Sequence, residues 1–283
     1  MVTLRGRVHG LDFLPGRFRW ATMTSQPGRA LIESLQESPD SDLCRDKFDS
    51  NAELYFAVPD NQAVIKLVKP PNDPTLSADK TALFELLTTL PEESDRYFLK
   101  TYALNGCSQR LAVAYQRKLV EEQIERLEKA VIRPSGFRLR SLALAEGYRI
   151  FCRPLGGDLV CLVNIDCHQT LLVFLNKGVT VATGFVARSF PDENDSAACK
   201  SALIDIAALV RYRQSLLFKD GFTAPLSLVI LCGEKADTTL SEPLAQMLRV
   251  KVAFPEFRQE LFAENVANPS PLFLAVLGLT VVS

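Results

Sequence analysis

The sequence predicts an α/β fold, because apolar strands alternate with amphipathic helices along its 283 residues. Several of the apolar runs, such as Leu159–Ile165 and Leu226–Cys232, are continuous, which is typical of sheets covered on both faces. A strand–turn–strand pattern at Val8–Met23 is also echoed at 159–184. We therefore expect two related lobes, joined near the turn-forming residues Gly156–Asp158.

The strands are predicted from short runs of strand-forming residues. Two of these runs, Leu54–Val58 and Ala63–Val68, are separated by Pro59–Gln62 and are expected to pair as a hairpin, with one face inward and one outward. In chain order the predicted strands are Val8–Phe13, Phe18–Met23, Leu54–Val58, Ala63–Val68, Arg110–Ala114, Leu159–Ile165, Leu171–Leu175 and Leu226–Cys232.

The helices are predicted from apolar residues spaced three and four apart. Leu119–Ile132 has this spacing and ends before Pro134, which disfavours helix at the residue preceding it. Ala198–Phe218 follows the acidic segment 191–195, which suits a helix N-terminus. A third amphipathic helix is predicted at Leu240–Leu248.

Composition excludes several classes of protein. The sequence is 47% hydrophobic and 23% charged, as expected of a globular protein. Its net charge of −1 provides no basic surface for nucleic acid. We see no secretory signal and no apolar run of the roughly 20 residues that a membrane helix needs. The seven cysteines form no C-x-x-C pair, so we expect reduced thiols, with Cys161 and Cys232 in the core.

Five stretches of the sequence together carry a resemblance to a known family. They are Gly10–Phe13, the segment from Leu54 to Pro70, the helix ending at 127–134, Leu231–Ala236 and Leu277–Leu279. They resemble the PilM family, the actin-like cytoplasmic proteins of type IV pilus assembly, which are relatives of the cell-division ATPase FtsA. In chain order they are similar to the family's first phosphate motif, the start and the close of its small extra subdomain, its adenosine motif and part of its C-terminal helix.

This resemblance implies an actin-like, ribonuclease H-like fold with two lobes. The first lobe would span 1–156 and contain a small inserted subdomain at about 53–134. The second lobe would span 157–283. Because the segment from Gly184 to Ala202 is short, this lobe would lack the subdomain that covers the nucleotide in the family.

The nucleotide loops depart from the family pattern. Leu14 and Pro15 replace a glycine and a serine in the first motif, which adds bulk and removes an N–H group. Asn164 replaces an aspartate of the second motif, and Asp166 replaces a glycine with a carboxylate that would repel phosphate. We therefore predict a pseudo-ATPase without cofactor or metal. The degenerate nucleotide-loop positions are Asp12, Leu14, Pro15, Asn164, Asp166, Gly233 and Glu234.

For two parts of these loops, a structural interpretation is weighed against a catalytic or metal-binding one. Cys167 beside His168 resembles a nucleophile–base pair, but neighbouring residues on a tight turn point apart, so a surface turn is the better interpretation. Asp12 is interpreted as a turn aspartate that stabilises the local backbone rather than as a holder of metal-bound water.

The function that the resemblance implies is a non-catalytic scaffold under the inner-membrane pilus machine. It would bind the N-terminal cytoplasmic tail of a PilN-like inner-membrane protein in a groove between the main lobe and the small subdomain, alongside other assembly components. The alternatives are the cytoplasmic domain of a GspL-like type II secretion protein and an active actin-like ATPase with a rearranged site. The predicted partner-binding residues are Leu54, Phe56, Val58, Ile65 and Leu67.

Overall fold

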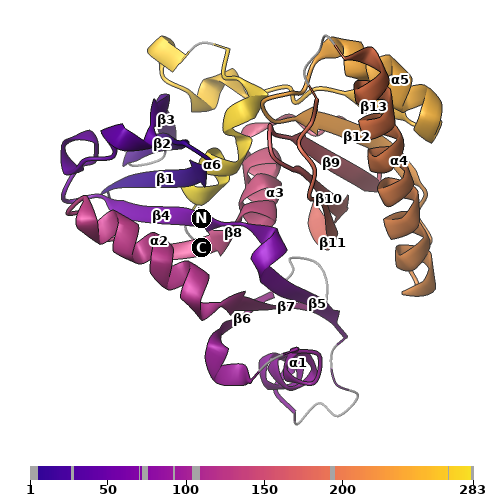
Figure 1. The fold of residues 1–283 in the computed structure, drawn as a ribbon, viewed down its shortest axis with the longest axis horizontal. Helices are drawn as coiled ribbons and strands as arrows, with labels where there is room; N and C mark the ends of the chain where they lie inside the picture. Colours follow the sequence, from indigo (N-terminus) through magenta and orange to yellow (C-terminus); the bar gives the residue numbers. More distant parts are fainter. Residues whose placement is uncertain are drawn as a thin grey trace.

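The computed structural model describes residues 6–26, 29–69, 71, 76–91, 93–103, 109–191, 195–266 and 268–281. These residues form two five-stranded sheets and one three-stranded sheet. The two large sheets lie next to each other with helices between and outside them, and the small sheet lies below the first one in Figure 1.

The first large sheet is built from the N-terminal part of the chain. Its strands are β1 (Gly6–Leu14), β2 (Arg17–Gln26), β3 (Arg29–Pro39), β4 (Glu53–Val58) and β8 (Gly136–Leu139). Their order is β3-β2-β1-β4-β8. The first three strands are antiparallel neighbours, whereas β4 runs parallel to both β1 and β8.

The second large sheet repeats this topology. It contains β9 (Leu159–Ile165), β10 (Thr170–Asn176), β11 (Val179–Val186), β12 (Leu226–Cys232) and β13 (Lys251–Ala253). Their order is β11-β10-β9-β12-β13, again with three antiparallel strands followed by two parallel ones. The repeat expected from the sequence is therefore present as two sheets of identical connectivity.

Two helices fill the space between the large sheets. α3 (Arg140–Phe151) packs on the second sheet through residues such as Leu144, while α6 (Leu274–Leu279) packs on the first. The helices cross at Gly147 and Gly278. A Cβ atom added to Gly278 would lie 1.7 Å from the Ala143 carbonyl oxygen, so only glycine allows this crossing.

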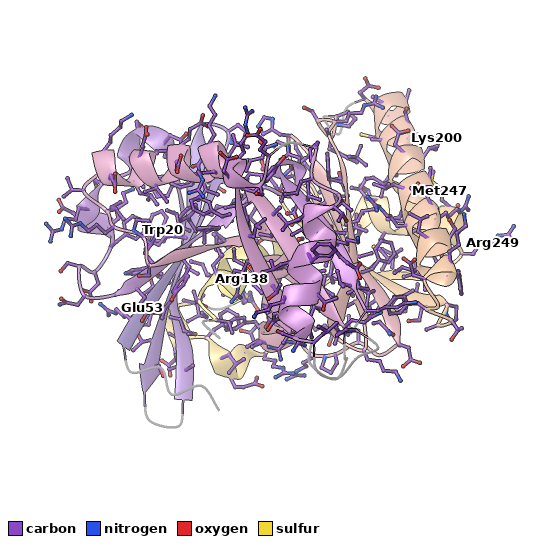
Figure 2. The ribbon with its side chains drawn as sticks, turned by 90° about the horizontal axis from the view of Figure 1, so that it is seen from below. Trp20, Glu53, Arg138, Lys200, Met247 and Arg249 are labelled. Carbon is purple, nitrogen blue, oxygen red and sulfur yellow. The ribbon has the colours of Figure 1, made fainter. Side chains whose placement is uncertain are left out.

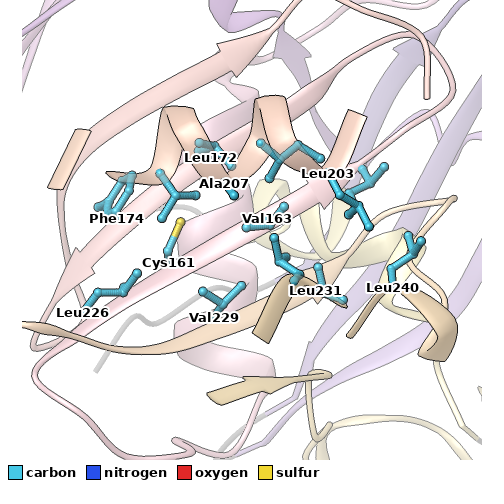
Figure 3. Close-up of a cluster of buried hydrophobic side chains, with 14 of the residues drawn as sticks. Cys161, Val163, Leu172, Phe174, Leu203, Ala207, Leu226, Val229, Leu231 and Leu240 are labelled. Carbon is cyan, nitrogen blue, oxygen red and sulfur yellow. The ribbon is translucent and has the colours of Figure 1, made fainter. Parts of the chain in front are cut away.

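The outer faces of the sheets are covered by the amphipathic helices. α4 (Ser196–Lys219) and α5 (Thr238–Leu248) cover the second sheet, and Figure 3 shows Leu203 and Leu240 meeting strand residues such as Val163. α2 (Arg117–Lys129) covers the first sheet through Val120 and Leu127. Their periodicity in the sequence reflects this one-sided burial.

The small sheet has the order β5-β7-β6 and carries α1 (Ala78–Leu87) on one face. Its strands are β5 (Ala63–Val68), β6 (Tyr97–Ala103) and β7 (Arg110–Gln116). The predicted hairpin between β4 and β5 is wrong, because β4 pairs with β1 and β8 while β5 pairs with β7. The turn of 3-10 helix at Asp60–Gln62 leads the chain out of the large sheet instead of reversing it.

The connection between β11 and α4 is short. Only residues 187–195 join β11 to α4, which leaves no room for an inserted subdomain. Asp195 caps α4 by accepting a hydrogen bond from the Ala198 N–H. Residues 192–194 of the acidic segment, and Pro70 at the edge of the small subdomain, lie outside the described residues. Among the described helices, none has the length and apolarity that crossing a bilayer requires.

Candidate functional site

Three loops at the ends of the large sheets meet between the lobes. They are the turn between β1 and β2, the turn between β9 and β10, and the loop after β12. The last loop depends on Gly233, which has a φ of +95° and lies so close to β9 that an added Cβ would be 2.6 Å from the Ile165 carbonyl oxygen. These are the loops in which the resemblance places the nucleotide, and the structure brings their predicted residues together.

Two arginines from β2 occupy the space between these loops. Arg19 is buried, and its guanidinium donates to Glu234 at 3.1 Å and lies 3.6 Å from an Asp166 carboxylate oxygen. Arg17 also donates to Glu234 and lies 3.7 Å from the Cys167 sulfur. The arginines therefore connect the first lobe to carboxylates of the second.

Glu37 on β3 completes this charged cluster. It accepts a hydrogen bond from Arg17 at 3.1 Å and another from the Nε–H of Arg19. Two guanidinium groups thus lie among three carboxylates, which balance their charge, and both groups donate hydrogen bonds to Glu37 and Glu234. A phosphate group entering here would have to displace carboxylates from both arginines while passing Asp166 and Glu234. The arrangement opposes anion binding, although it contains two cations.

The cluster also shifts the pKa values of Glu234 and Cys167. Burial favours the neutral form of Glu234, but the hydrogen bond from Cys167 and the charges of Arg17 and Arg19 outweigh it and lower the pKa of this carboxyl. Burial and the neighbouring Glu234 raise the pKa of the Cys167 thiol. The thiol donates to Glu234 at 2.9 Å, whereas a reactive cysteine needs a depressed pKa. Cys167 is therefore a hydrogen-bond donor within the cluster.

The remaining loop positions serve structure. Leu14 is buried at the end of β1, and Pro15 is exposed in the turn. Asn164 is buried and donates from its side-chain amide to Asp166 at 2.7 Å. The other Asp166 oxygen accepts from the Glu234 backbone N–H at 3.3 Å. Asp166 thus holds two of the loops together from the position where the family has a glycine.

Asp12 is engaged by a buried ion pair. It lies within β1 and not in a turn, so the interpretation as a turn aspartate is wrong. Its carboxylate accepts hydrogen bonds from Arg140 at 2.6 and 3.0 Å, and Arg140 also donates to the Phe13 carbonyl at 2.8 Å. Arg140 thus holds one oxygen of this buried carboxylate and joins β1 to the first residue of α3. In the described part of the chain, no three His, Cys, Asp or Glu side chains are grouped as metal ligands.

Asp60 is a second buried carboxyl beside α3. One of its oxygens accepts from the Ser141 backbone N–H at 2.9 Å, which caps the helix, and the other has no hydrogen-bond partner. Burial raises the pKa of Asp60 to about 6, although the hydrogen bond to Ser141 and the charge of Arg140 oppose the shift.

This carboxyl gives a testable pH dependence. The unfolded chain releases the Asp60 proton near pH 3.8, whereas the folded chain retains it up to about pH 6. The stability that this group contributes is therefore present below pH 3.8 and lost as the pH rises to about 6. We expect Asp60→Asn to remove this loss, so the free energy of unfolding of the variant relative to that of the native chain should grow by about 2 kcal/mol between pH 4 and pH 7. Urea unfolding across this range measures it, and a constant difference would contradict it.

The five predicted partner-binding residues separate into two groups. Leu54, Phe56 and Val58 are at most 2% exposed, because β4 is an inner strand of the large sheet. Ile65 and Leu67 line a cavity of about 350 Å³. The opposite wall of this cavity comes from β11 and α4 of the second lobe, and these residues were missed in the sequence.

Two further hollows lie elsewhere. One of about 330 Å³ is formed in the first lobe by residues that include His9, Leu54 and Ile132. Another of about 470 Å³ lies between α4 and α5 and includes Lys200 and Met247. Figure 2 shows Lys200 of α4 and Met247 of α5 on the same side of the molecule, far from Trp20 in the first sheet.

Comparison with solved structures identifies the fold. A chain of the PilM-PilN type IV pilus biogenesis complex superimposes with a TM-score of 0.76 at 15% identity, covering 98% of both chains. A Bacteroides thetaiotaomicron protein with an actin-like ATPase fold gives a TM-score of 0.59 at 12% identity, covering 100% of both chains. The cytoplasmic domain of EpsL, an inner-membrane component of the type II secretion system of Vibrio cholerae, gives 0.52 at 9% identity, covering 86% of this chain and 94% of that one.

These likenesses show that the chain has an actin-like fold, with the two lobes expected from the sequence. No protein-family model matches the sequence, and no curated protein matches it. The function therefore has to be argued from the site.

Proposed function

We propose that this protein is a non-catalytic scaffold of type IV pilus assembly, located at the cytoplasmic face of the inner membrane. It binds the N-terminal cytoplasmic tail of a PilN-like inner-membrane protein and contacts other components of the assembly. It does not bind or hydrolyse nucleotide, although it keeps the two-lobed fold of actin-like ATPases.

The observation that carries this proposal is the charged cluster between the lobes. Arg17 and Arg19 lie where phosphates would be expected, and their charges are taken up by Glu37, Asp166 and Glu234. Nucleotide-dependent motion requires a ligand that binds one arrangement of the lobes better than another. Here the protein's own side chains connect the lobes, so this arrangement does not need a nucleotide.

The small sheet supports the binding half of the proposal. It is retained beside the first lobe, and its residues Ile65 and Leu67 border a cavity instead of being fully covered. The likeness to a chain from a complex named for PilM and PilN supports a partner of the PilN kind. Short peptides from disordered tails suit such a cavity, with modest affinity because the tail loses conformational entropy on binding.

The test is calorimetric titration of this chain with peptides from the N-terminal tails of PilN-like proteins encoded beside it. We expect saturable binding in the micromolar range, and we expect Mg-ATP to leave the affinity unchanged. A scrambled peptide of the same composition is the control. Absence of binding by every such tail would refute the scaffold function, and a severalfold effect of Mg-ATP would favour an active ATPase.

A second candidate is the cytoplasmic domain of a GspL-like secretion protein, which the likeness to EpsL supports. The two candidates differ in their partners. Binding of a tail from a neighbouring pilus protein supports the first, whereas binding only to components of a type II secretion system supports the second.

A further inference from the structure

The cavity beside the small sheet is bordered by the edge of a strand. β11 is the outermost strand of its sheet and pairs with β10 on one side. Five consecutive residues of this strand, Val181–Phe185, line the cavity. Successive side chains of a strand point to opposite faces, so a cavity lying on a sheet face would be lined by alternate residues. Lining by consecutive residues means that the backbone edge of β11 faces the cavity.

The other walls combine apolar and charged residues. β5, the outermost strand of the small sheet, lines the cavity with Ala63 and with the consecutive residues Ile65, Lys66 and Leu67, so its edge also borders the cavity. The C-terminal half of α4 contributes Arg213, and Asp220 follows its end. A guest in this cavity would thus lie between two strand edges, with the apolar side chains of Ile65 and Leu67 on one side and charged groups beside α4 on the other.

Asp60 and Arg213 bring polar groups to the wall of the cavity. Asp60 is 5% exposed and accepts a hydrogen bond from the Ser141 backbone N–H. The Nε atom of Arg213 lies 3.2 Å from the position of a Cβ atom built on Gly184, so its guanidinium packs against β11. The side chains of a guest that lie beside these two residues would therefore have to be polar.

The free edge of β11 favours an extended guest. An extended segment along five residues of β11 would span about 17 Å and would follow the strand over the whole length that lines the cavity. Edge strands readily accept such segments, because their unpaired N–H and C=O groups form a template for pairing.

We propose that an extended peptide of about five residues binds here by adding a strand to the free edge of β11. Alternate apolar side chains of the peptide rest on Ile65 and Leu67, and polar ones face Arg213 and Asp60. This inference rests on the proposed function, since the peptide is the partner's tail. Beyond that function, the peptide binds as an added strand, and part of its site lies on the second lobe. The bound tail therefore connects the small sheet to the second lobe.

The test uses the intact protein and chemically altered peptides. Overlapping ten-residue peptides from the cytoplasmic tails of neighbouring inner-membrane proteins are titrated first. The binding peptide is then made in two forms, with N-methyl groups at odd or at even positions. N-methylation removes the N–H donors on one side of an extended strand. One form should bind at least about tenfold more weakly, because it loses two or three hydrogen bonds, and the other should stay within about threefold.

Hydrogen exchange and one pair of variants locate the site. Amide protection should appear at 181–185, and Ile65→Lys should weaken the binding at least about tenfold. Phe84→Lys, at an exposed apolar residue on α1 of the same subdomain, is the matched control and should have no effect.

The outcomes separate this inference from the proposed function. Equal binding by both methylated forms, or protection confined to the first-lobe hollow near His9 and Ile132, would overturn strand addition while the scaffold function stands. If no tail binds at all, the scaffold function fails and the inference fails with it.

Discussion

Replacing Arg140 by alanine is expected to lower the free energy of unfolding by about 3–5 kcal/mol, the usual cost of leaving one partner of a buried ion pair alone. Arg140 and Asp12 are each at most 4% exposed, and Arg140 also satisfies the Phe13 carbonyl. Its removal leaves the Asp12 carboxylate without its only strong donors in the described structure. Chemical unfolding of the two purified proteins measures the difference.

Two variants make this test specific. Arg149→Ala removes another arginine of α3, one that pairs with Glu146 at the protein surface. This substitution should lower the free energy of unfolding by less than about 1 kcal/mol. The double variant Asp12→Leu/Arg140→Met removes both charges and should be more stable than Arg140→Ala. A loss below about 1 kcal/mol for Arg140→Ala would show that the pair is not buried as described.

The second large effect is expected at the crossing of α3 and α6. Gly278→Ala would place a Cβ atom 1.7 Å from the Ala143 carbonyl oxygen and 2.7 Å from the Gly147 nitrogen. Both neighbours are backbone atoms, so the helices must separate and the packing between the large sheets must open. We expect a loss of about 3 kcal/mol or more, at the upper end of overpacking costs, and reduced yield of folded protein.

Gly178→Ala is the control for this substitution. Gly178 has a φ of +79° and open space around its Cβ position, so alanine there tests backbone strain without a clash. It should cost about 1–2 kcal/mol. Thermal unfolding compares the two variants, and equal midpoints for Gly278→Ala and the native chain would contradict the close crossing.

The sequence alone predicted those helices that bury one face and expose the other. α2, α4 and α5 each bury one face on a sheet, so their apolar spacing was visible. α3 and α6 were not found by periodicity, because they lie between two sheets and are buried on nearly all sides. The β4–β5 hairpin was predicted from sequence neighbours, whereas the actual pairing of β4 depends on β1 and β8, which lie far away in the chain.

The candidate site was predictable only in part. The loop residues Asp166 and Glu234 indicated that phosphate would be repelled, and the structure brings them together. Arg17 and Arg19 gave no signal, because alternating charged residues on a strand normally face solvent. Only the meeting of two lobes turns them inward. β11 was not predicted as a wall of the cavity, because the resemblance places the partner groove between the main lobe and the small subdomain, whereas β11 belongs to the second sheet.

The central claim is that protein charges occupy the place of a nucleotide. The most direct measurement is calorimetric titration of the native chain with Mg-ATP, accompanied by thermal unfolding. We predict no saturable heat and no change in the unfolding midpoint. A micromolar ligand at a hundredfold excess over its Kd would stabilise the chain by about 2.7 kcal/mol and raise the midpoint by about 4–5 °C. Saturable binding with such a shift would contradict the account, because phosphates would then have to displace Glu37, Asp166 and Glu234 from the two arginines.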